Sequence, residues 1–332
     1  MGEGEKQQMS PLPLVSVVTP SLNQAGFIRE AIDSVLAQDY PRLEYLVVDG
    51  GSIDGTLDIL RSYGDRLQWI SEPDAGQSDA INKGWRRAGG EVIAWLNSDD
   101  VYLPGAVRRA VAHLQKHPEA AGVYGDCYFV DAQGRELERY PARPYDYGEL
   151  VRRTVNYIPQ PATFLHRTVL DSVGFLDPGL AMALDLEYWL RLGLQHSLVY
   201  LPQPLACLRL HSSCKSVAHL RRYGPELIRI YRRLFARPDL PPAIRALKAE
   251  AMSNIHYRVA DEHLWAGDFA EARRYVLRGW RHAPGRPSRV AIKVLVVSLL
   301  GHAGLALLRR LGRAPTFARL GEGRGVTTNL ED

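Results

Sequence analysis

The chain has 332 residues, of which 46% are hydrophobic and 23% charged, and its formal net charge is +4. This composition is that of an ordinary globular protein, and the length predicts one large domain with an appendage. The three cysteines are odd in number and widely spaced, which excludes a disulfide framework and a zinc ribbon and favours the cytoplasm. Residues 1–13 are polar and lack the apolar core of a signal peptide, so we expect a disordered lead-in and no export by that route.

The charge is unevenly distributed along the chain. Residues 1–208 hold 18 Lys and Arg against 27 Asp and Glu, whereas residues 209–332 hold 23 against 10. A basic second half favours an anionic partner. Its aromatic residues do not alternate with arginines as in a single-strand binding track, so we expect an anionic membrane surface and no nucleic acid.

Strands and helices alternate over the first hundred residues. Apolar β-rich runs predict strands at 14–19, 43–48, 67–70 and 92–96. Helical spacing predicts helices at 26–38 and 77–88, and a further helix that starts after Asp54, which we expect as its N-cap. Four such alternations predict a parallel sheet with right-handed crossovers.

The pattern is looser beyond residue 100, in the half expected to build the pocket for a second substrate. We predict helices at 103–115 and 184–194, strands at 123–130 and 162–166, and a strand pair over 198–210 broken by Pro202 and Pro204. From residue 217 the chain reads as all-helical. Ala266-Gly267-Asp268 is typical of the turn in one tetratricopeptide-like helical hairpin, which we interpret as a packing element.

An apolar run at 294–308 is flanked by arginines and lysines on both sides, so we expect a basic apolar helix over 288–313. The run is shorter than the roughly twenty residues that cross a bilayer. Three interpretations remain open: a helix packed on the main domain, a helix lying in the membrane interface, and a true span. We predict peripheral association with the membrane.

Two adjacent carboxylates follow the apolar run at 92–96. Asp99 and Asp100 would stand at the carboxyl edge of the sheet, where open α/β folds bind their ligands. Two like charges held that close require a cation or a proton. The sequence therefore predicts a divalent cation, Mn²⁺ or Mg²⁺, bound together with a polyphosphate. The alternative is that this pair only caps the following helix.

Five segments in this order resemble the inverting glycosyltransferases of family 2. They are VVTPSLN at 17–23, VVDGGSIDGT at 47–56, DAINKG at 79–84, LNSDD at 96–100 and DLEYWLRL at 185–192. The EPDAGQSD segment at 72–79 is similar to enzymes that build bacterial surface polysaccharides. The resemblance implies an α/β GT-A fold, with a Rossmann-like, mostly parallel central sheet and an all-helical C-terminal extension. We expect a glycosyltransferase domain over 14–216, with a nucleotide-binding half at 14–100 and an acceptor-binding half at 101–216, and a helical region over 217–332.

The resemblance assigns donor-binding roles to residues of the first half. Asp49 would accept a hydrogen bond from the N3 proton of a pyrimidine, which favours a UDP or dTDP donor, and Gly50 and Gly51 would let the base approach. The remaining donor-binding residues on this assignment are Pro20, Ser21, Asn23, Gln77, Asp79, Lys83 and Asp99. Each also has a plain structural interpretation, as a turn, a cap or a solvated charge.

Metal and base roles follow from the same resemblance. Asp100 would bind the metal directly, with Asp99 and His211 as further ligands, although His211 also suits a structural role. Asp185 matches the position of the general base that takes the proton of the acceptor hydroxyl, and Glu187 is the fallback.

The chain departs from the pattern of the family in two places. Leu184 stands where many relatives have Glu, which alters the acceptor contacts or the pKa of the base. Gly76 stands where some relatives have a basic residue, which puts donor contacts by that segment in doubt.

The sequence thus predicts an inverting glycosyltransferase that moves a sugar from a nucleoside diphosphate to a glycan or polyprenyl-linked acceptor. We expect it in the cytoplasm, peripheral on the inner face of the cell membrane. One alternative is a degenerate, non-catalytic subunit that binds sugar nucleotides or glycans. Another is a nucleotidyltransferase, which would need a glycine-rich, basic loop after the first strand, and residues 19–23 do not form one.

Overall fold

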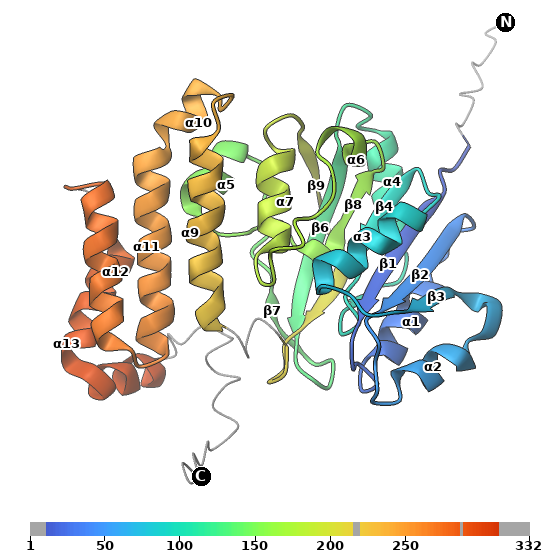
Figure 1. Ribbon diagram of the computed structural model, residues 1–332, viewed down its shortest axis with the longest axis horizontal. Helices are drawn as coiled ribbons and strands as arrows, with labels where there is room; N and C mark the ends of the chain where they lie inside the picture. The colour runs from blue at the N-terminus through green and yellow to red at the C-terminus, as the bar shows by residue number, and fades with distance from the viewer. Residues whose placement is uncertain (1–10, 215–219, 286–287, 312–332) are drawn as a thin grey trace, which may run out of the picture. The chain divides into compact units, whose positions relative to one another are not determined.

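The structure, a computed structural model, describes residues 11–214, 220–285 and 288–311 (Figure 1). The expected lead-in lies mostly outside the described residues. The chain divides into two compact units. The first comprises Met1–Cys127, Gln160–Phe175 and Leu198–Cys207, and the second comprises Tyr128–Pro159, Leu176–Ser197 and Leu208–Asp332. The boundary expected at residue 216 stays a prediction.

The first unit is built on a mixed sheet. Its strands are β1 (Val15–Ser21), β2 (Leu43–Asp49), β3 (Gln68–Ser71), β4 (Val92–Trp95), β5 (Val101–Tyr102), β6 (Gly122–Val130), β8 (Thr163–His166) and β9 (Leu198–Arg209), of which β6 and β9 end in the second unit. Their order in space is β3-β2-β1-β4-β8-β6-β9-β5. The pairs among the first four strands are parallel, as predicted. The sheet continues antiparallel where β8 pairs with β4 and β6, and where β5 pairs with β9.

The parallel strands form the core of the first unit. Every residue of β1 and β4 is buried, which explains their continuous apolar runs. Helix α3 (Gln77–Arg87) packs against β1 and β2, and Gly84 allows the close approach because a Cβ there would lie 2.3 Å from Val18 Cγ1. In the register of the sheet, Ser21 lies opposite Asp49 and Val18 lies opposite Trp95. The loops after β1, β2 and β4 therefore start at one edge of the sheet.

The predicted break at Pro202 and Pro204 is wrong, because β9 is a single strand of 12 residues. Proline lacks the N–H that a ladder hydrogen bond requires. On the β5 side of β9, only Ala206 and Cys207 have strand partners, so the prolines need not donate there. A short neighbouring strand thus makes two prolines compatible with a continuous strand.

The remaining helices of the first unit are α1 (Ile28–Leu36), α2 (Thr56–Ser62), α4 (Ala106–Gln115) and α6 (Val169–Ser172). Two predicted helix starts are corrected. Helix α4 begins at Ala106 and not at residue 103, because its N-cap Gly105 has a left-handed φ of 72°. The N-cap of α2 is Gly55 and not Asp54. The Asp54 carboxylate still accepts a hydrogen bond from the Thr56 backbone N–H at 3.1 Å.

The second unit is mainly helical over its described residues. Its elements are β7 (Glu136–Arg139), which pairs with the end of β6, α5 (Tyr147–Arg153), α7 (Leu184–Leu192), α9 (Leu220–Ala236), α10 (Pro242–Ala246), α11 (Lys248–Trp265), α12 (Phe269–His282) and α13 (Arg289–Arg310). The predicted helical extension is confirmed over the described part. Helices α11 and α12 form the predicted hairpin, whose turn contains Gly267 with a φ of 80°.

Helix α13 contains the whole apolar run at 294–308, and of the helix expected over 288–313, residues 312 and 313 lie outside the described residues. It departs from helical geometry at Gly301, where φ is 58°. By length and composition α13 can cross a membrane, and 33% of its apolar window is buried. One face joins a cluster with α11 and α12 through Ala291, Val294, Val297, Leu305 and Leu308.

Candidate functional site

The Asp49 carboxylate holds the loop that follows β2. It is fully buried. Its Oδ2 accepts from the backbone N–H groups of Gly51 (3.0 Å) and Ser52 (2.9 Å) and from Ser71 Oγ (2.7 Å), and its Oδ1 accepts from Ser52 Oγ. Gly51 takes a φ of 90°, which a residue with a side chain rarely adopts. Asp49 therefore organises the turn that the sequence assigned to the donor base.

The loop after β1 is joined to the same turn. Asn23, with a left-handed φ of 54°, donates from its backbone N–H to Ser52 Oγ at 2.7 Å and accepts from the Ile53 N–H at 2.9 Å. Ser21 Oγ is buried and has no hydrogen-bond partner among the described residues. Pro20 is also buried. A buried hydroxyl without a partner costs free energy unless a ligand or water supplies one.

The segment between β3 and α3 is braced by its own charges. Lys83 Nζ lies 3.2 Å from Glu72 and 3.5 Å from Asp79, and it donates to the Pro73 carbonyl at 2.8 Å. Burial works to lower the pKa of Lys83, but the carboxylates of Glu72 and Asp79 outweigh it and raise the pKa. Asp79 also accepts from the Ala75 N–H at 3.1 Å. In this structure the contacts of Asp79 and Lys83 stabilise residues 72–75, which lead into α3.

A network of side-chain amides surrounds Asp100 at the end of β4. Asn97 Nδ2 donates to Asp100 Oδ2 at 3.0 Å and to Gln160 Oε1 at 3.1 Å, and Asn97 Oδ1 accepts from Gln77 Nε2 at 2.7 Å. Gln160 is anchored in turn on the Trp95 carbonyl. Asp100 is 2% exposed and Asp99 is partly exposed. Sequence reasoning missed the roles of Asn97, which lies in a quoted motif, and of Gln160, which no motif marks.

The two adjacent carboxylates fit a hard divalent cation. Mg²⁺ and Mn²⁺ prefer carboxylate oxygens, and Mg²⁺ is often held by one or two of them together with the phosphates of a substrate. Among the described residues, no group of three or more His, Cys, Asp or Glu side chains is placed to hold a metal. Asp99 and Asp100 belong to the first unit, and the third expected ligand, His211, belongs to the second.

His211 and the motif around it lie after β9. The His211 ring is 7% exposed, and its Nδ1 lies 2.8 Å from Ser213 Oγ. Arg209, just before it, donates to the Ala132 carbonyl at 3.0 Å. These contacts hold Arg209 and His211 within the second unit.

Asp185 is the second residue of α7 and is partly buried. Its Oδ1 accepts from the Leu186 backbone N–H at 2.8 Å, and its Oδ2 accepts from Asn156 Nδ2 at 2.7 Å. Burial raises the pKa of Asp185, although these two hydrogen bonds and the charge of Arg258 oppose the rise. A raised pKa brings a carboxylate closer to the range of an effective general base.

Glu187, the fallback base, is already paired. Glu187 is 6% exposed, and its carboxylate accepts two hydrogen bonds from the Arg191 guanidinium, at 2.7 and 3.0 Å. Both hydrogen bonds come from a charged donor, so Glu187 is held in an ion pair, whereas the donors to Asp185 are a neutral amide and a backbone N–H. The geometry therefore favours Asp185 over Glu187 as a proton acceptor.

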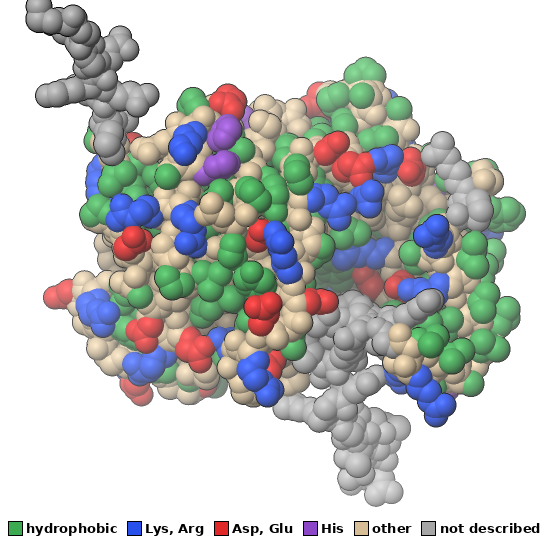
Figure 2. Space-filling view, turned by 180° about the vertical axis from the view of Figure 1, so that it is seen from behind, with side chains coloured by type: hydrophobic (Ala, Val, Ile, Leu, Met, Phe, Trp, Pro, Cys, Tyr) green, Lys and Arg blue, Asp and Glu red, His purple; other side chains and the backbone are tan. Residues whose placement is uncertain are grey.

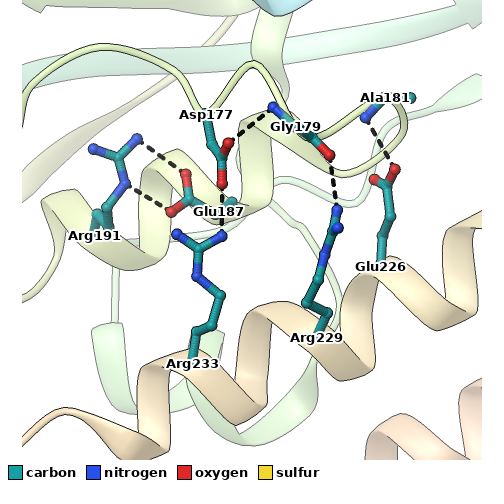
Figure 3. A network of polar contacts seen from close by, with 8 residues as sticks. All are labelled: Asp177, Gly179, Ala181, Glu187, Arg191, Glu226, Arg229 and Arg233. Atoms are coloured by element: carbon teal, nitrogen blue, oxygen red, sulfur yellow. Dashed lines mark hydrogen bonds and ion pairs between the residues drawn. The ribbon is translucent and has the colours of Figure 1, made fainter.

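Helix α9 grips the segment that leads into α7 (Figure 3). The Glu226 carboxylate accepts from three consecutive backbone N–H groups, those of Ala181 (2.9 Å), Met182 (2.9 Å) and Ala183 (3.1 Å). On the same side of α9, Arg229 donates to the Gly179 carbonyl. Arg233 donates to the Asp177 carboxylate. A negative charge beside the first N–H groups of a helix also stabilises its dipole. Glu226 thus fixes the start of α7, two residues before Asp185.

The chain matches the model of a known family and several curated proteins. Residues 16–174 match the model described as glycosyl transferase family 2. An uncharacterized glycosyltransferase of Rickettsia prowazekii is 29% identical over 60% of this chain and 65% of its own length. An uncharacterized glycosyltransferase of Mycobacterium tuberculosis is 31% identical over 56% of this chain and 71% of its own length. The putative teichuronic acid biosynthesis glycosyltransferase TuaG of Bacillus subtilis is 33% identical over 43% of this chain and 59% of its own length.

Solved structures share the fold at low sequence identity. S. aureus TarS matches with a TM-score of 0.60 and 17% identity, over 93% of this chain and 55% of the other. The mannosyltransferase PcManGT from Pyrobaculum calidifontis, in complex with GDP-Man and Mn²⁺, matches with a TM-score of 0.60 and 20% identity, over 94% of this chain and 85% of the other. At these identities the likeness establishes the α/β GT-A fold with its helical extension.

The matched region covers only part of the length of five glycosyltransferases from Rickettsia species. The match covers between 27% and 65% of their lengths. The family model and the Mycobacterium relative nevertheless establish the relationship at the level of the family. The chain belongs to glycosyltransferase family 2.

Proposed function

We propose that this chain transfers a sugar, with inversion, from a nucleoside diphosphate to a growing glycan in the synthesis of a cell-surface polysaccharide. The observation that carries the proposal is the Asp99–Asp100 pair at the carboxyl end of β4, with Asp100 held by Asn97. Names of relatives support the polysaccharide context, since TuaG is named for teichuronic acid biosynthesis. Support for a nucleotide-sugar donor comes from TarS, which was solved with UDP-GlcNAc, and PcManGT, solved with GDP-Man.

The loops after β1 and β2 form the proposed donor-binding part. Among the described residues, Asp49 Oδ1 accepts one hydrogen bond, whereas Oδ2 accepts three. A carboxylate oxygen accepts about two. We therefore assign the N3 proton of uracil or thymine to Oδ1, reached when the donor opens the turn that buries it. The unpartnered Ser21 hydroxyl, with Pro20 and Asn23 beside it, is assigned to the base and ribose.

Gln77, Asp79 and Lys83 complete the proposed donor-binding set. We assign them an indirect role, which is to stabilise the segment between β3 and α3 and the acidic pair. Gln77 reaches the acidic pair through Asn97, while Asp79 and Lys83 brace residues 72–79 from inside. Asp99 and Asp100 are the residues that would hold Mn²⁺ or Mg²⁺, and the role of His211 as a further ligand stays a prediction. When bound, that cation offsets the charge that grows on the leaving diphosphate.

Asp185 is assigned the proton of the acceptor hydroxyl. Inversion by direct displacement requires a base on the face of the sugar opposite the leaving group. The carboxylate has hydrogen bonds to both oxygens, one each, which leaves acceptor capacity on either oxygen.

Calorimetric titration of nucleotides tests the donor part of the proposal. UDP and dTDP, then GDP and ADP, are titrated into the full chain with and without Mn²⁺, and the Asp100→Ala variant is the control. Tight, Mn²⁺-dependent binding of a pyrimidine diphosphate that is lost in the variant is the expected result. Binding of no nucleotide would contradict the proposal and favour a non-catalytic subunit. Preference for GDP would overturn the assignment of Asp49 to a pyrimidine.

We also propose that the enzyme works in the cytoplasm, bound peripherally to the inner face of the cell membrane, where a polyprenyl-linked acceptor is available. The face of α13 away from its packed side exposes Ile292 (52%), Val296 (52%), Leu299 (77%) and Leu300 (56%). In Figure 2, hydrophobic side chains lie among lysines and arginines at the edge formed by the last helices. An apolar face with basic flanks suits the interface of an anionic bilayer.

Flotation with liposomes tests this part independently. The full chain is expected to float with vesicles of phosphatidylglycerol and phosphatidylethanolamine at low salt, and less with phosphatidylcholine alone. Replacing Leu299 and Leu300 together by Gln should abolish flotation, whereas Leu277→Gln on α12 serves as a matched exposed control. Equal behaviour of wild type and the double variant would sink the proposal. Extraction by detergent alone would instead indicate a span.

A further inference from the structure

Asn156 makes a direct side-chain contact with the proposed base. Its Nδ2 lies 2.7 Å from Asp185 Oδ2, and the two residues are separated by 29 positions in the chain. An amide that donates to a carboxylate stabilises the charged form and fixes the plane of the group. No motif in the sequence marks Asn156, and it precedes α7 by a long stretch of chain.

The amide of Asn156 is itself oriented. Asn156 Oδ1 accepts from the Ile158 backbone N–H at 3.0 Å, which leaves Nδ2 as the end that faces Asp185. The Tyr140 hydroxyl donates to the Asn156 carbonyl at 2.8 Å. These two contacts determine both the side chain and the backbone of Asn156, so the donor is directed before any substrate binds.

Helix α11 holds the same segment from the other side. Arg258 Nη1 donates to the Thr154 carbonyl at 2.6 Å. Thr154 is 1% exposed and has a left-handed φ of 57°, a conformation that is unfavourable for a residue with a side chain. A conformation of that kind persists only where neighbours hold it. Arg258 therefore supports the bend that carries the chain to Asn156.

The groups around Asp185 come from several elements. Arg258 of α11 lies over the ring of Tyr223 of α9 at 4.9 Å and 3.6 Å from the Glu262 carboxylate. The charge of Arg258 lowers the pKa of Asp185, against the larger effect of burial. Asp185 in turn contributes to a raised pKa of Tyr223, whose main cause is burial. The base thus shares a partly buried polar cluster with the C-terminal helices.

We propose that Asn156 is a positioning residue for the general base, held in place by Arg258, so that the C-terminal helices take part in building the catalytic apparatus. This inference rests on the proposed role of Asp185. Asn156 turns Oδ2 toward itself and favours the ionised carboxylate, which must be free of a proton to accept one. Arg258 acts one step further away, through the backbone of Thr154.

The test measures protonation of Asp185 itself. The full chain is labelled with ¹³C at the aspartate carboxyl carbons and titrated by NMR, and the signal absent from Asp185→Asn identifies the group. Asn156→Ala should raise the proton affinity of Asp185 on the order of tenfold, because a hydrogen bond to a charged group is lost. Asn156→Asp keeps the acceptor for the Ile158 N–H but faces Asp185 with a second carboxylate. In this variant the two carboxylates should titrate in two coupled steps, with one apparent pKa above and the other below that of Asp185 in the wild type.

Asn254→Ala is the matched control. Asn254 lies on α11, and its Nδ2 donates to the Arg152 carbonyl at 2.8 Å, so this variant removes the same kind of amide from a contact near Asn156 in the chain and leaves the contact between Asn156 and Asp185 in place. The Asp185 signal should titrate as in the wild type. An unchanged titration in both Asn156 variants would overturn the inference, as would an equal shift in Asn254→Ala. The proposed function fails separately, if Asp185→Asn retains transfer activity.

Discussion

Asn97 donates a hydrogen bond of 3.0 Å to the Asp100 carboxylate while its carbonyl oxygen accepts from Gln77 at 2.7 Å. One amide side chain therefore links the acidic end of β4 to the start of α3. Because an amide has one acceptor end and one donor end, only one orientation of Asn97 satisfies both neighbours. The acidic pair is thus held by the segment that the sequence associates with the donor.

Removing that amide should weaken binding of the donor diphosphate. Asn97→Ala removes the amide that donates to Asp100 Oδ2, so we expect Mn²⁺-dependent affinity for UDP to fall about tenfold, the effect of one lost hydrogen bond to a charged group. Calorimetric titration measures it, and thermal unfolding verifies that the variant is folded. Asn254→Ala, in the second unit, is the control and should bind UDP as the wild type does. An unchanged affinity in folded Asn97→Ala would contradict the prediction.

The proposed roles of Asp185 and Asp100 should separate in kinetics and binding. Asp185→Asn keeps the shape of the side chain but removes the base, so transfer should fall by a factor on the order of 10³ with donor affinity nearly intact. Asp100→Ala should weaken donor binding and transfer together. Donor dissociation constants and initial transfer rates, measured side by side, decide. Equal losses of donor affinity in the two variants would refute the assignment.

Transfer should also depend on pH through Asp185. Its raised pKa means that the carboxylate gains a proton at a higher pH than an ordinary aspartate does. A base must be unprotonated, so the rate should decline as pH falls through that pKa and reach its plateau above it. A profile of kcat/KM from pH 4 to 8 measures this. A plateau that extends down to the ordinary range of an aspartate would count against Asp185.

Glu226 should contribute to stability through the start of α7. Glu226→Ala leaves three backbone N–H groups without their acceptor, and we expect a loss of about 1–3 kcal/mol in the free energy of unfolding. Glu226→Gln loses the charge and keeps one acceptor oxygen, which can serve Met182 and Ala183, while its NH₂ group replaces the oxygen that serves Ala181, so it should cost less than Glu226→Ala, about 1 kcal/mol. Urea unfolding gives both values. A larger loss of stability in Glu226→Gln than in Glu226→Ala would contradict the role given to the hydrogen bonds of Glu226 (Figure 3).

Glu262 should make stability depend on pH near neutrality. Burial raises the pKa of Glu262 to about 7 from its ordinary 4.5, in spite of the neighbouring Arg258. The folded protein therefore holds a proton that the unfolded chain releases, and stability should fall as pH rises from about 4.5 to about 7. Urea unfolding at several pH values measures the slope. Glu262→Gln should flatten it, and an identical slope in wild type and variant would argue against this group.

The parts of the structure that depend on local pattern were predictable from the sequence. Continuous apolar runs marked β1 and β4, and the Gly-rich turn after Asp49 marked the end of β2, because burial on both faces leaves a direct trace in composition. The contacts of Asn156 with Asp185 and of Glu226 with Ala181 span 29 and 45 positions. Such pairings depend on how segments distant in the sequence pack together, and nothing in the sequence next to a polar residue indicates its distant partner.

The strand β9 shows the same limit from the other direction. Pro202 and Pro204 argue locally for a break, and the short β5 removes the reason for one. Whether a proline interrupts a strand depends on its neighbour in the sheet, which the sequence does not indicate.

The grip of Glu226 on the segment before α7 bears on how this chain can be divided. A shortened protein ending near residue 216 would retain every motif that defines the family, yet it would lack α9 and the carboxylate that receives three N–H groups. Removing the C-terminal helices would therefore remove contacts that hold the start of α7. Fusing these helices to another transferase would likewise leave Glu226 without the segment that it contacts here. The helices and the segment around α7 have to vary together, so a graft would need both.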